Sequence, residues 1–427
     1  MRACGRPCAA PLTSTAHSGD LVDVLRPFRA LRFAPGTDLA ATTTPPHDCF
    51  TLAERDALLA RDPHNVARLV RGQENPGDGE GPAHPSWHAR AADTLRSWVA
   101  DRTLVRDRAP ALYLYTIAHG PPEARRTLTA LIGRITLDPT GGRVKPHEAT
   151  LSRPKKDRLR LRQATGCDME PIWMLYRDPR GWVNEVAVSN AIDELVRFTD
   201  DDGHEHRLWR VDRREAVGEL VAQFEERTLV IADGHHRYQT ALEEAAGDPR
   251  RGAILTLLVR DDDPGLAIEA THRLVHGLPS APGPADLPAW NAQPIADPLA
   301  ALRGLASDGR EVILATQAGA WRLQLRPDAE LARGLGRLDR LAVSRLQERA
   351  LGPLGLPAGD ERVRFTRDVA RALQEVRSGH AQAAFLLPPE SPAAVLDVAA
   401  AGHLMPPKAT YFVPKPRSGL VMAPLDE

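Results

Sequence analysis

The chain has 427 residues, which is enough for two or three domains that each bury a core of their own. Its formal net charge of −1 argues against broad electrostatic binding to DNA or to an anionic membrane. No apolar run approaches the roughly 20 residues of a membrane helix, and residues 1–20 lack the apolar core of a secretory signal. We therefore expect a cytoplasmic protein with no membrane or nucleic-acid partner.

The first part of the chain is expected to be a flexible leader (1–20) followed by an N-terminal α/β region (21–140). The four cysteines are too few to staple the fold, and Cys4 and Cys8 in the leader have no second pair at zinc spacing. Thr51 is suited to cap a helix, with Glu54 completing a capping box. Further elements are a helix over 88–104, a strand over 111–118 and a helix-like pattern over 123–135.

The rest of the chain is expected to form a phosphate-binding core (141–276) and a C-terminal α/β lobe with a substrate-side tail (277–427). A segment with five prolines, 276–294, marks the boundary between them. Apolar runs indicate strands, and a periodic run indicates a helix. The strands are 171–178, 252–261, 311–316, 320–325 and 382–388, and the helix is 367–379. This alternation predicts an α/β or mixed α+β protein in two or three lobes.

One strand-to-helix turn, "TLVIADGHHRYQTAL" at 228–242, gathers several functional side chains. The β-branched run ends at Asp233, Gly234 permits a tight bend, and a helix is expected from about His235. Free N–H groups at a helix start favour a bound anion, and His235, His236 and Arg237 add donors. The pattern predicts a phosphate cradle, with Asp233 as an oxygen ligand for Mg²⁺. An Asp helix cap with surface histidines is the plainer alternative.

A zinc site is a weaker interpretation of the same turn. Adjacent histidines point in different directions on a helix, so His235 and His236 do not easily share one metal. His204 and His206 in "DGHEHRLW" are possible additional ligands, but their spacing is equally natural for an exposed turn.

Two further segments carry candidate groups. In "RVKPHEATLSRPKKDR", Pro146 is expected to start a helix whose first turn holds His147 and Glu148, and Glu148 could act as a general base. An acid that only complements the helix dipole is the alternative. The basic run that follows could be a solvated face or a phosphate clamp; it comprises Arg153, Lys155, Lys156 and Arg158, with Asp157 inside it.

Near the C-terminus, "MPPKATYFVPKPRSGLV" places Lys408, Thr410 and Lys415 among prolines and aromatics. Such a tail could close over a site, with Lys408 meeting an anionic group of the substrate. By composition it could equally be an exposed edge strand.

Taken together, "RPFRALRF", "PHEATLSRPKKDRLRLRQATG", "VIADGHHRYQTAL", "THRLV" and "MPPKATYFVPK" resemble a bacterial family known as domain of unknown function 1015. The resemblance runs from about Leu25 to Leu425 in matching order, and the family name itself gives no activity.

A more distant resemblance is to the free-serine kinases of the ParB/sulfiredoxin-like superfamily, through the order "KPHE", "DGHHR", "PKxT". It implies a ParB/sulfiredoxin-like core and phosphoryl transfer from ATP or ADP to the hydroxyl of free L-serine, with Mg²⁺. It also implies that Glu148 is the catalytic base and that Asp233–Arg237 bind the nucleotide phosphates. His147, Lys408 and Thr410 are then expected beside the substrate.

The chain departs from those kinases at two places. They carry an Arg-His pair after "PKxT", where this chain has Tyr411 and Phe412, and the first ~140 residues have no counterpart in them. The leading hypothesis is a small-molecule kinase acting on serine or a related hydroxy or amino acid. The alternatives are a nucleotide-binding ParB-like DNA-associated or regulatory protein and a nucleotide or phosphoester hydrolase. The acceptor and the oligomeric state are not predicted.

Overall fold

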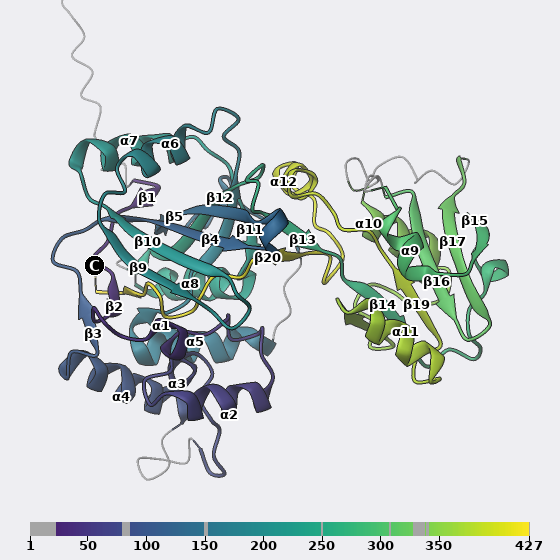
Figure 1. The fold of residues 1–427 in the computed structure, drawn as a ribbon, viewed down its shortest axis with the longest axis horizontal. Helices are drawn as coiled ribbons and strands as arrows, with labels where there is room; N and C mark the ends of the chain where they lie inside the picture. Colours follow the sequence, from purple (N-terminus) through teal and green to yellow (C-terminus); the bar gives the residue numbers. More distant parts are fainter. Residues whose placement is uncertain are drawn as a thin grey trace, which may run out of the picture.

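The structure is a computed structural model that describes residues 23–78, 86–148, 153–248, 251–306, 309–327, 338 and 341–426 (Figure 1). The predicted leader, with Cys4 and Cys8, lies outside the described residues, as do the side chains of Arg153 and Lys155. The predicted mixed α/β class is confirmed. None of the helices that the structure describes is both long and apolar enough to cross a bilayer.

A large mixed sheet forms the body of the first lobe. Among the described residues it has nine strands, of which β6 and β8 run parallel to β11 and β12, respectively. In order across the sheet the strands are β6 (Val144–Pro146), β11 (Leu229–Asp233), β8 (Ile172–Tyr176), β12 (Ala253–Arg260), β5 (Arg126–Thr136), β4 (Leu112–His119), β10 (Glu205–Val211) and β9 (Glu194–Thr199), with β1 (Leu25–Arg26) pairing with β5.

Both faces of this sheet are buried, and alternate side chains of each strand serve opposite faces. Leu112 and Leu114 of β4 face one apolar core, which is covered by α6 (Trp182–Ser189) and α7 (Arg214–Phe224) (Figure 1). Tyr113 of β4 faces the other core, where it joins Trp173, Phe412 and Val421. Phe412 and Val421 belong to the C-terminal segment, so this segment packs on the sheet.

The helix predicted over 123–135 is wrong, because this segment forms strand β5. Its apolar residues fit a helical period, but Leu128, Ala130 and Ile132 also alternate along a strand and reach one core, while Leu131 and Ile135 reach the other. Burial on both faces gives a strand a near-continuous apolar run, which sequence periodicity does not separate from a helix.

Most of the other predicted elements are confirmed as elements of the same type. The strands predicted at 111–118, 171–178, 252–261, 311–316, 320–325 and 382–388 and the helices predicted at 88–104 and 367–379 correspond to β4, β8, β12, β16 (Glu311–Thr316), β17 (Gly319–Leu325), β19 (Ala383–Leu386), α4 (Trp87–Ala100) and α11 (Val369–Arg377). The capping box of Thr51 and Glu54 opens α2 (Leu52–Arg61) as predicted.

The second lobe is a sheet of six strands among the described residues, and it lies beside the first lobe (Figure 1). Its order is β15 (Trp290–Ile295), β17, β16, β19, β14 (His272–Val275) and β18 (Val363–Thr366), accompanied by α9 (Pro298–Arg303), α10 (Ala342–Leu346) and α11. Helix α12 (Pro392–Ala400) then leads back towards the first lobe.

Further helices and three pairs of strands complete the described part of the first lobe. The helices are α1 (Leu39–Thr42), α3 (Ala67–Val70), α5 (Arg153–Thr165) and α8 (His235–Gly247), and the two-stranded pairs are β2 (Leu31–Phe33) with β3 (Leu104–Arg106), β7 (Cys167–Asp168) with β21 (Ala423–Pro424), and β13 (Ala267–Glu269) with β20 (Tyr411–Val413). The pairs of β20 and β21 bring the C-terminal segment back onto the first lobe. The limits of the predicted domains stay a prediction.

Candidate functional site

A cavity of about 580 Å³ brings together the three segments that the sequence singled out. It is lined by Glu148, by the turn Asp233–Arg237 and by the C-terminal segment. The remaining lining residues come from the N-terminal region, from α5, from the end of β11, from the link between β13 and β14, and from the second lobe; they are His47, Asp48, Cys49, Arg158, Ala232, Thr271, Phe365, Thr366 and Arg367. The C-terminal contributors are Lys408, Thr410, Tyr411, Phe412 and Lys415.

The turn between β11 and α8 has the form that the sequence predicted. β11 ends at Asp233, and α8 begins at His235. Between them Gly234 has a φ of 91°, a left-handed conformation that favours glycine. A Cβ at Gly234 would also lie only 3.0 Å from Nη2 of Arg237, so the guanidinium group of Arg237 packs against the glycine. The first N–H groups of α8 have no acceptor within the helix, and residues of this first turn line the cavity.

Arg237 is anchored to the backbone beneath the turn. Its Nη1 donates to the carbonyl oxygens of Glu170 and Pro171, at 3.0 and 2.9 Å. The side chain thus contributes positive charge to the cavity while part of its hydrogen-bonding capacity holds the start of β8 in place.

Asp233 forms an ion pair with Lys415 from the far end of the chain. Nζ of Lys415 lies 2.8 Å from Oδ2 of Asp233, across 182 residues of sequence. Oδ1 of Asp233 accepts the N–H of Gly234 at 2.8 Å. Burial alone would raise the pKa of Asp233, but the charges of Lys415 and Arg237 outweigh burial and hold that pKa below its usual range. Asp233 is therefore an ionised carboxylate on the cavity wall.

Lys415 was seen in the sequence as one polar residue of the tail but not assigned to the site. Its ammonium group also lies 4.3 Å from the centre of the Tyr411 ring. Nothing in the local sequence pairs Lys415 with Asp233, because the contact depends on the return of the chain across the first lobe.

Glu148 is held by the backbone of the C-terminal segment. Its Oε1 accepts the N–H of Lys408 at 3.0 Å, and Glu148 forms a parallel bridge with Met405. Lys408 has a φ of 57°, which is uncommon for a residue with a side chain, and its carbonyl oxygen accepts a bond from Nη2 of Arg273 at 3.2 Å. Burial raises the pKa of Glu148 above its ordinary value, although Lys408 and Arg273 oppose the shift.

The expected helix start at Pro146 is wrong. Pro146 is the last residue of β6, which pairs in parallel with β11, and α5 begins only at Arg153. A proline has no backbone N–H to donate to a neighbouring strand. Pro146 is tolerated on β6 because β6 is the edge strand of the sheet. Glu148 therefore owes its place to the sheet edge and to the bridge with Met405 rather than to a helix N-terminus.

His147 has a positioning role in the structure. It is 1% exposed, and its Nδ1 donates to the carbonyl of Ile231, so its Nε2 accepts the hydroxyl of Thr410 at 2.8 Å. The backbone N–H of His147 donates to Nε2 of His235 at 3.4 Å. These bonds join β6, β11, α8 and the C-terminal segment. The expected contact of His147 with a substrate stays a prediction.

The stability of the fold should depend on pH through His147. Burial lowers the pKa of His147 to about 4, from about 6.5 in an unfolded chain. Below pH 6.5 the unfolded state takes up a proton that the folded state does not, so stability is lost as the pH falls from 6.5 towards 4, by about 2 kcal/mol at pH 5.

Melting curves at pH 7.5 and pH 5 should show a smaller difference in melting temperature for His147→Gln than for the wild type. The variant His380→Gln changes an exposed histidine and serves as the control; equal shifts in all three proteins would contradict the prediction.

The N-terminal region is held beside the cavity by Glu170, a buried acid that was not predicted from the sequence. Its carboxylate accepts the backbone N–H of His47 at 2.8 Å and the hydroxyl of Ser418 at 2.8 Å, and it pairs with Nδ1 of His47 at 2.7 Å. Burial opposes ionisation, but the neighbouring His47 and Arg237 hold the pKa of Glu170 below its ordinary value. This single side chain thus links both ends of the chain behind the cavity.

The basic run on α5 contributes one cation to the cavity. Arg158 lines it, donates to the carbonyl of Val70 at 2.8 Å and pairs with Asp157, which also bonds His88. Lys156 is exposed on the same helix. Within the part of the run that is described, Lys156 fits the solvated-face interpretation, and a phosphate clamp through Arg158 stays a prediction.

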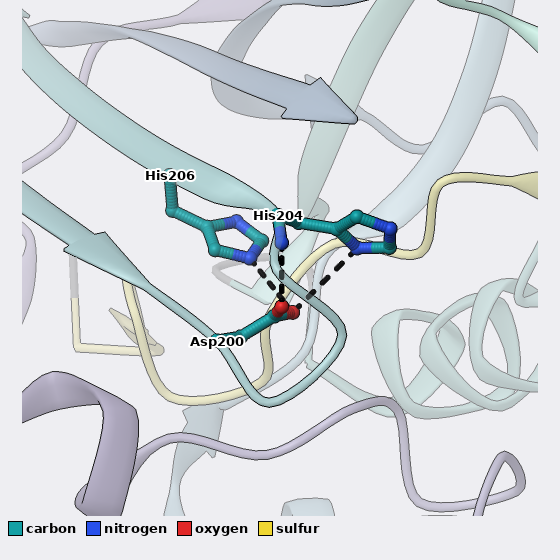
Figure 2. A group of neighbouring side chains, drawn as sticks. All are labelled: Asp200, His204 and His206. Carbon is teal, nitrogen blue, oxygen red and sulfur yellow. Dashed lines mark hydrogen bonds and ion pairs between the residues drawn. The ribbon is translucent and has the colours of Figure 1, made fainter. Parts of the chain in front are cut away.

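The histidines of "DGHEHRLW" do not line this cavity; His204 lies on the turn between β9 and β10, and His206 lies near the start of β10 (Figure 2). Both rings face Asp200, whose Oδ2 lies 3.0 Å from Nε2 of His206 and 3.6 Å from Nδ1 of His204. Burial lowers the pKa of His206, so the neutral ring donates from Nε2 to Asp200 and accepts the hydroxyl of Tyr115 on Nδ1 at 2.7 Å. Oδ1 of Asp200 accepts the backbone N–H of His204 at 2.9 Å. Hydrogen bonding of the turn accounts for this cluster.

Comparisons with known proteins give a family and distant structural likenesses. A solved structure of a conserved hypothetical protein from Pyrococcus furiosus is 12% identical, covers 66% of this chain and 90% of its own, and has a TM-score of 0.34. A free serine kinase in complex with AMP is 13% identical, covers 66% and 86%, and has a TM-score of 0.34. SbnI from Staphylococcus aureus, with a C-terminal truncation, is 11% identical, covers 69% and 87%, and has a TM-score of 0.37. No curated protein sequence matches the chain significantly.

The family model described as "Protein of unknown function (DUF1015)" matches residues 25–330. The matched part includes Glu148 and the turn Asp233–Arg237, whereas Lys408 and Lys415 lie beyond it. The chain belongs to the DUF1015 family.

Proposed function

We propose that the protein is a small-molecule kinase, which transfers a phosphoryl group from ATP or ADP to the hydroxyl of free L-serine or a related hydroxy or amino acid. The observation that carries the proposal is the meeting of Glu148, Asp233–Arg237 and Lys408–Lys415 around one cavity. In phosphoryl transfer the protein chiefly positions the two substrates and stabilises the developing charge, and these segments can do both.

The positive side of the cavity suits the phosphates of the nucleotide. The N-terminus of α8 offers backbone N–H groups, and Arg237 and Lys415 add charge at the end of β11. A site of this kind stabilises the negative charge that spreads over the transferred group.

In the proposed reaction, Glu148 acts as the general base. In the proposed step, the hydroxyl oxygen of the acceptor forms a bond to the terminal phosphorus of the nucleotide, and its proton passes to Glu148. The bond between that phosphorus and the bridging oxygen breaks, so ATP leaves as ADP, or ADP leaves as AMP. A pKa raised by burial brings Glu148 closer to the working pH, which favours proton transfer.

The cavity has suitable donors for Mg²⁺. Asp233 is ionised and Asp48 also lines the cavity, and hard oxygen ligands of this kind suit the ion. When bound, Mg²⁺ would neutralise phosphate charge. Asp233 would hold it, and Lys415 would share the same carboxylate.

The test is a direct assay of the purified chain with Mg²⁺, ATP or ADP, and a panel of L-serine, D-serine, L-threonine, L-homoserine and glycerate. Phosphorylated acceptor is measured by ³¹P NMR and mass spectrometry, together with the nucleotide product. We expect one new phosphoester per ADP or AMP formed. Release of inorganic phosphate without an added acceptor would point instead to a hydrolase, and the absence of any turnover would contradict both.

A further inference from the structure

Arg367 brings a guanidinium group from the second lobe into the cavity. It lies in the turn between β18 and α11, beyond the residues that the family model matches, and it lines the cavity together with Phe365 and Thr366. Its side chain remains 45% exposed. A cation that reaches a cavity wall from a separate sheet is available to recognise what enters the cavity.

Two contacts hold Arg367 in place. Its Nη1 donates to Oε2 of Glu269 at 2.7 Å, and its guanidinium carbon lies 3.7 Å from the centre of the Tyr411 ring. Glu269 and Tyr411 are themselves cross-strand partners in the pair of β13 and β20. The carboxylate and the ring are therefore neighbours on one rigid ribbon, and together they orient the arginine.

Most of the hydrogen-bonding capacity of Arg367 is left for a ligand. Among the described residues, its one protein hydrogen bond uses Nη1, whereas a guanidinium carries five N–H donors in a flat fork. Two other cations of the wall are more fully engaged, since Lys415 pairs with Asp233, and Arg237 donates to two carbonyl groups. A carboxylate matches the fork with two parallel bonds.

We infer that Arg367 binds the carboxylate of the acceptor and so restricts the kinase to hydroxy acids and hydroxy amino acids. This inference rests on the proposed function and specifies its substrate class. The phosphates would lie at the α8 turn, and the acceptor would lie between Glu148 and Arg367, with its hydroxyl at the former and its carboxylate at the latter. The second lobe thus takes part in selecting the acceptor.

The experiment compares L-serine with L-serinamide and serinol, which keep the hydroxyl but lack the carboxylate. The wild type should prefer L-serine in kcat/KM by roughly 10- to 100-fold, because a charged hydrogen-bond pair is lost with the other two. In Arg367→Gln this preference should shrink to a few-fold, through a higher KM for L-serine, while the KM for the nucleotide changes little. Arg367→Lys keeps the charge without the fork and should lie between the two.

Arg371→Ala is the matched control, because Arg371 lies four residues further on, pairs with Glu375 and is 70% exposed. It should keep the full preference for L-serine. Melting curves check that each variant folds, and calorimetric binding of L-serine and L-serinamide to the wild type gives a readout that needs no turnover. An unchanged preference in both folded Arg367 variants overturns the inference and leaves the kinase proposal standing. A wild type that phosphorylates no acceptor overturns both.

Discussion

Replacing Glu148 with glutamine is expected to lower kcat by roughly 10²- to 10⁴-fold, because the acceptor hydroxyl loses its base. Glutamine has the same shape, and its Oε1 can still accept the N–H of Lys408, so the C-terminal segment should keep its place. The affinity for the nucleotide should therefore be nearly unchanged. Steady-state kinetics, calorimetric titration with ADP and a melting curve measure the three properties on one protein preparation.

The pH profile gives the same prediction a second readout. A carboxylate must be ionised to act as a base, and burial raises the pKa of Glu148 above that of an ordinary glutamate. The acid limb of the kcat profile should accordingly lie at a higher pH than an ordinary glutamate would give. Glu243→Gln, which changes an exposed acid on α8, is the control and should retain full activity. A folded Glu148→Gln protein with wild-type kcat would remove Glu148 from the mechanism.

Replacing Lys415 with methionine should cost both stability and nucleotide affinity. The change leaves Asp233 on the cavity wall without the cation at 2.8 Å, and the loss of one partner of this partly buried pair costs about 1–3 kcal/mol. Nucleotide binding should weaken by roughly 10- to 100-fold because one cation leaves the phosphate side of the cavity. Urea denaturation and calorimetric titration with ADP measure the two effects.

A double variant separates the two effects of Lys415. In Lys415→Met with Asp233→Asn the uncompensated carboxylate is gone, so much of the lost stability should return while nucleotide binding stays weak. Lys156→Met removes an exposed lysine of α5 and should behave as the wild type. If Lys415→Met were as stable as the wild type and bound ADP equally well, the ion pair would have neither role.

The sequence was most informative where a local pattern is sufficient. The turn from β11 into α8 was predicted because a β-branched run, a glycine and a helix start follow one another directly. The capping box at Thr51 is equally local. β5 was misjudged because its burial on both faces, which comes from tertiary packing, hides the strand period.

The parts of the site that could not be predicted depend on long-range contacts. Pro146 resembles a helix start in sequence, yet an edge strand accepts it equally well, and only the sheet order shows which applies. The pairing of Lys415 with Asp233 and the entry of Arg367 from the second sheet span too much sequence for any local signal. Glu170 has no distinguishing local pattern in the sequence, and its role depends on hydrogen bonds from His47 and Ser418, which are far apart in the chain.

The return of the C-terminal segment has a consequence for how the protein is made. A ribosome delivers the second lobe before Lys408 and Lys415, so the cavity lacks one of its walls until these residues have been made. Until then Asp233 lacks its lysine partner, and ligand binding cannot stabilise the nascent chain. An mRNA truncated within the coding region of the second lobe would yield a protein that has Glu148 and the turn Asp233–Arg237 but lacks the C-terminal segment. Synthesis of the C-terminal segment is therefore the step that completes the cavity wall.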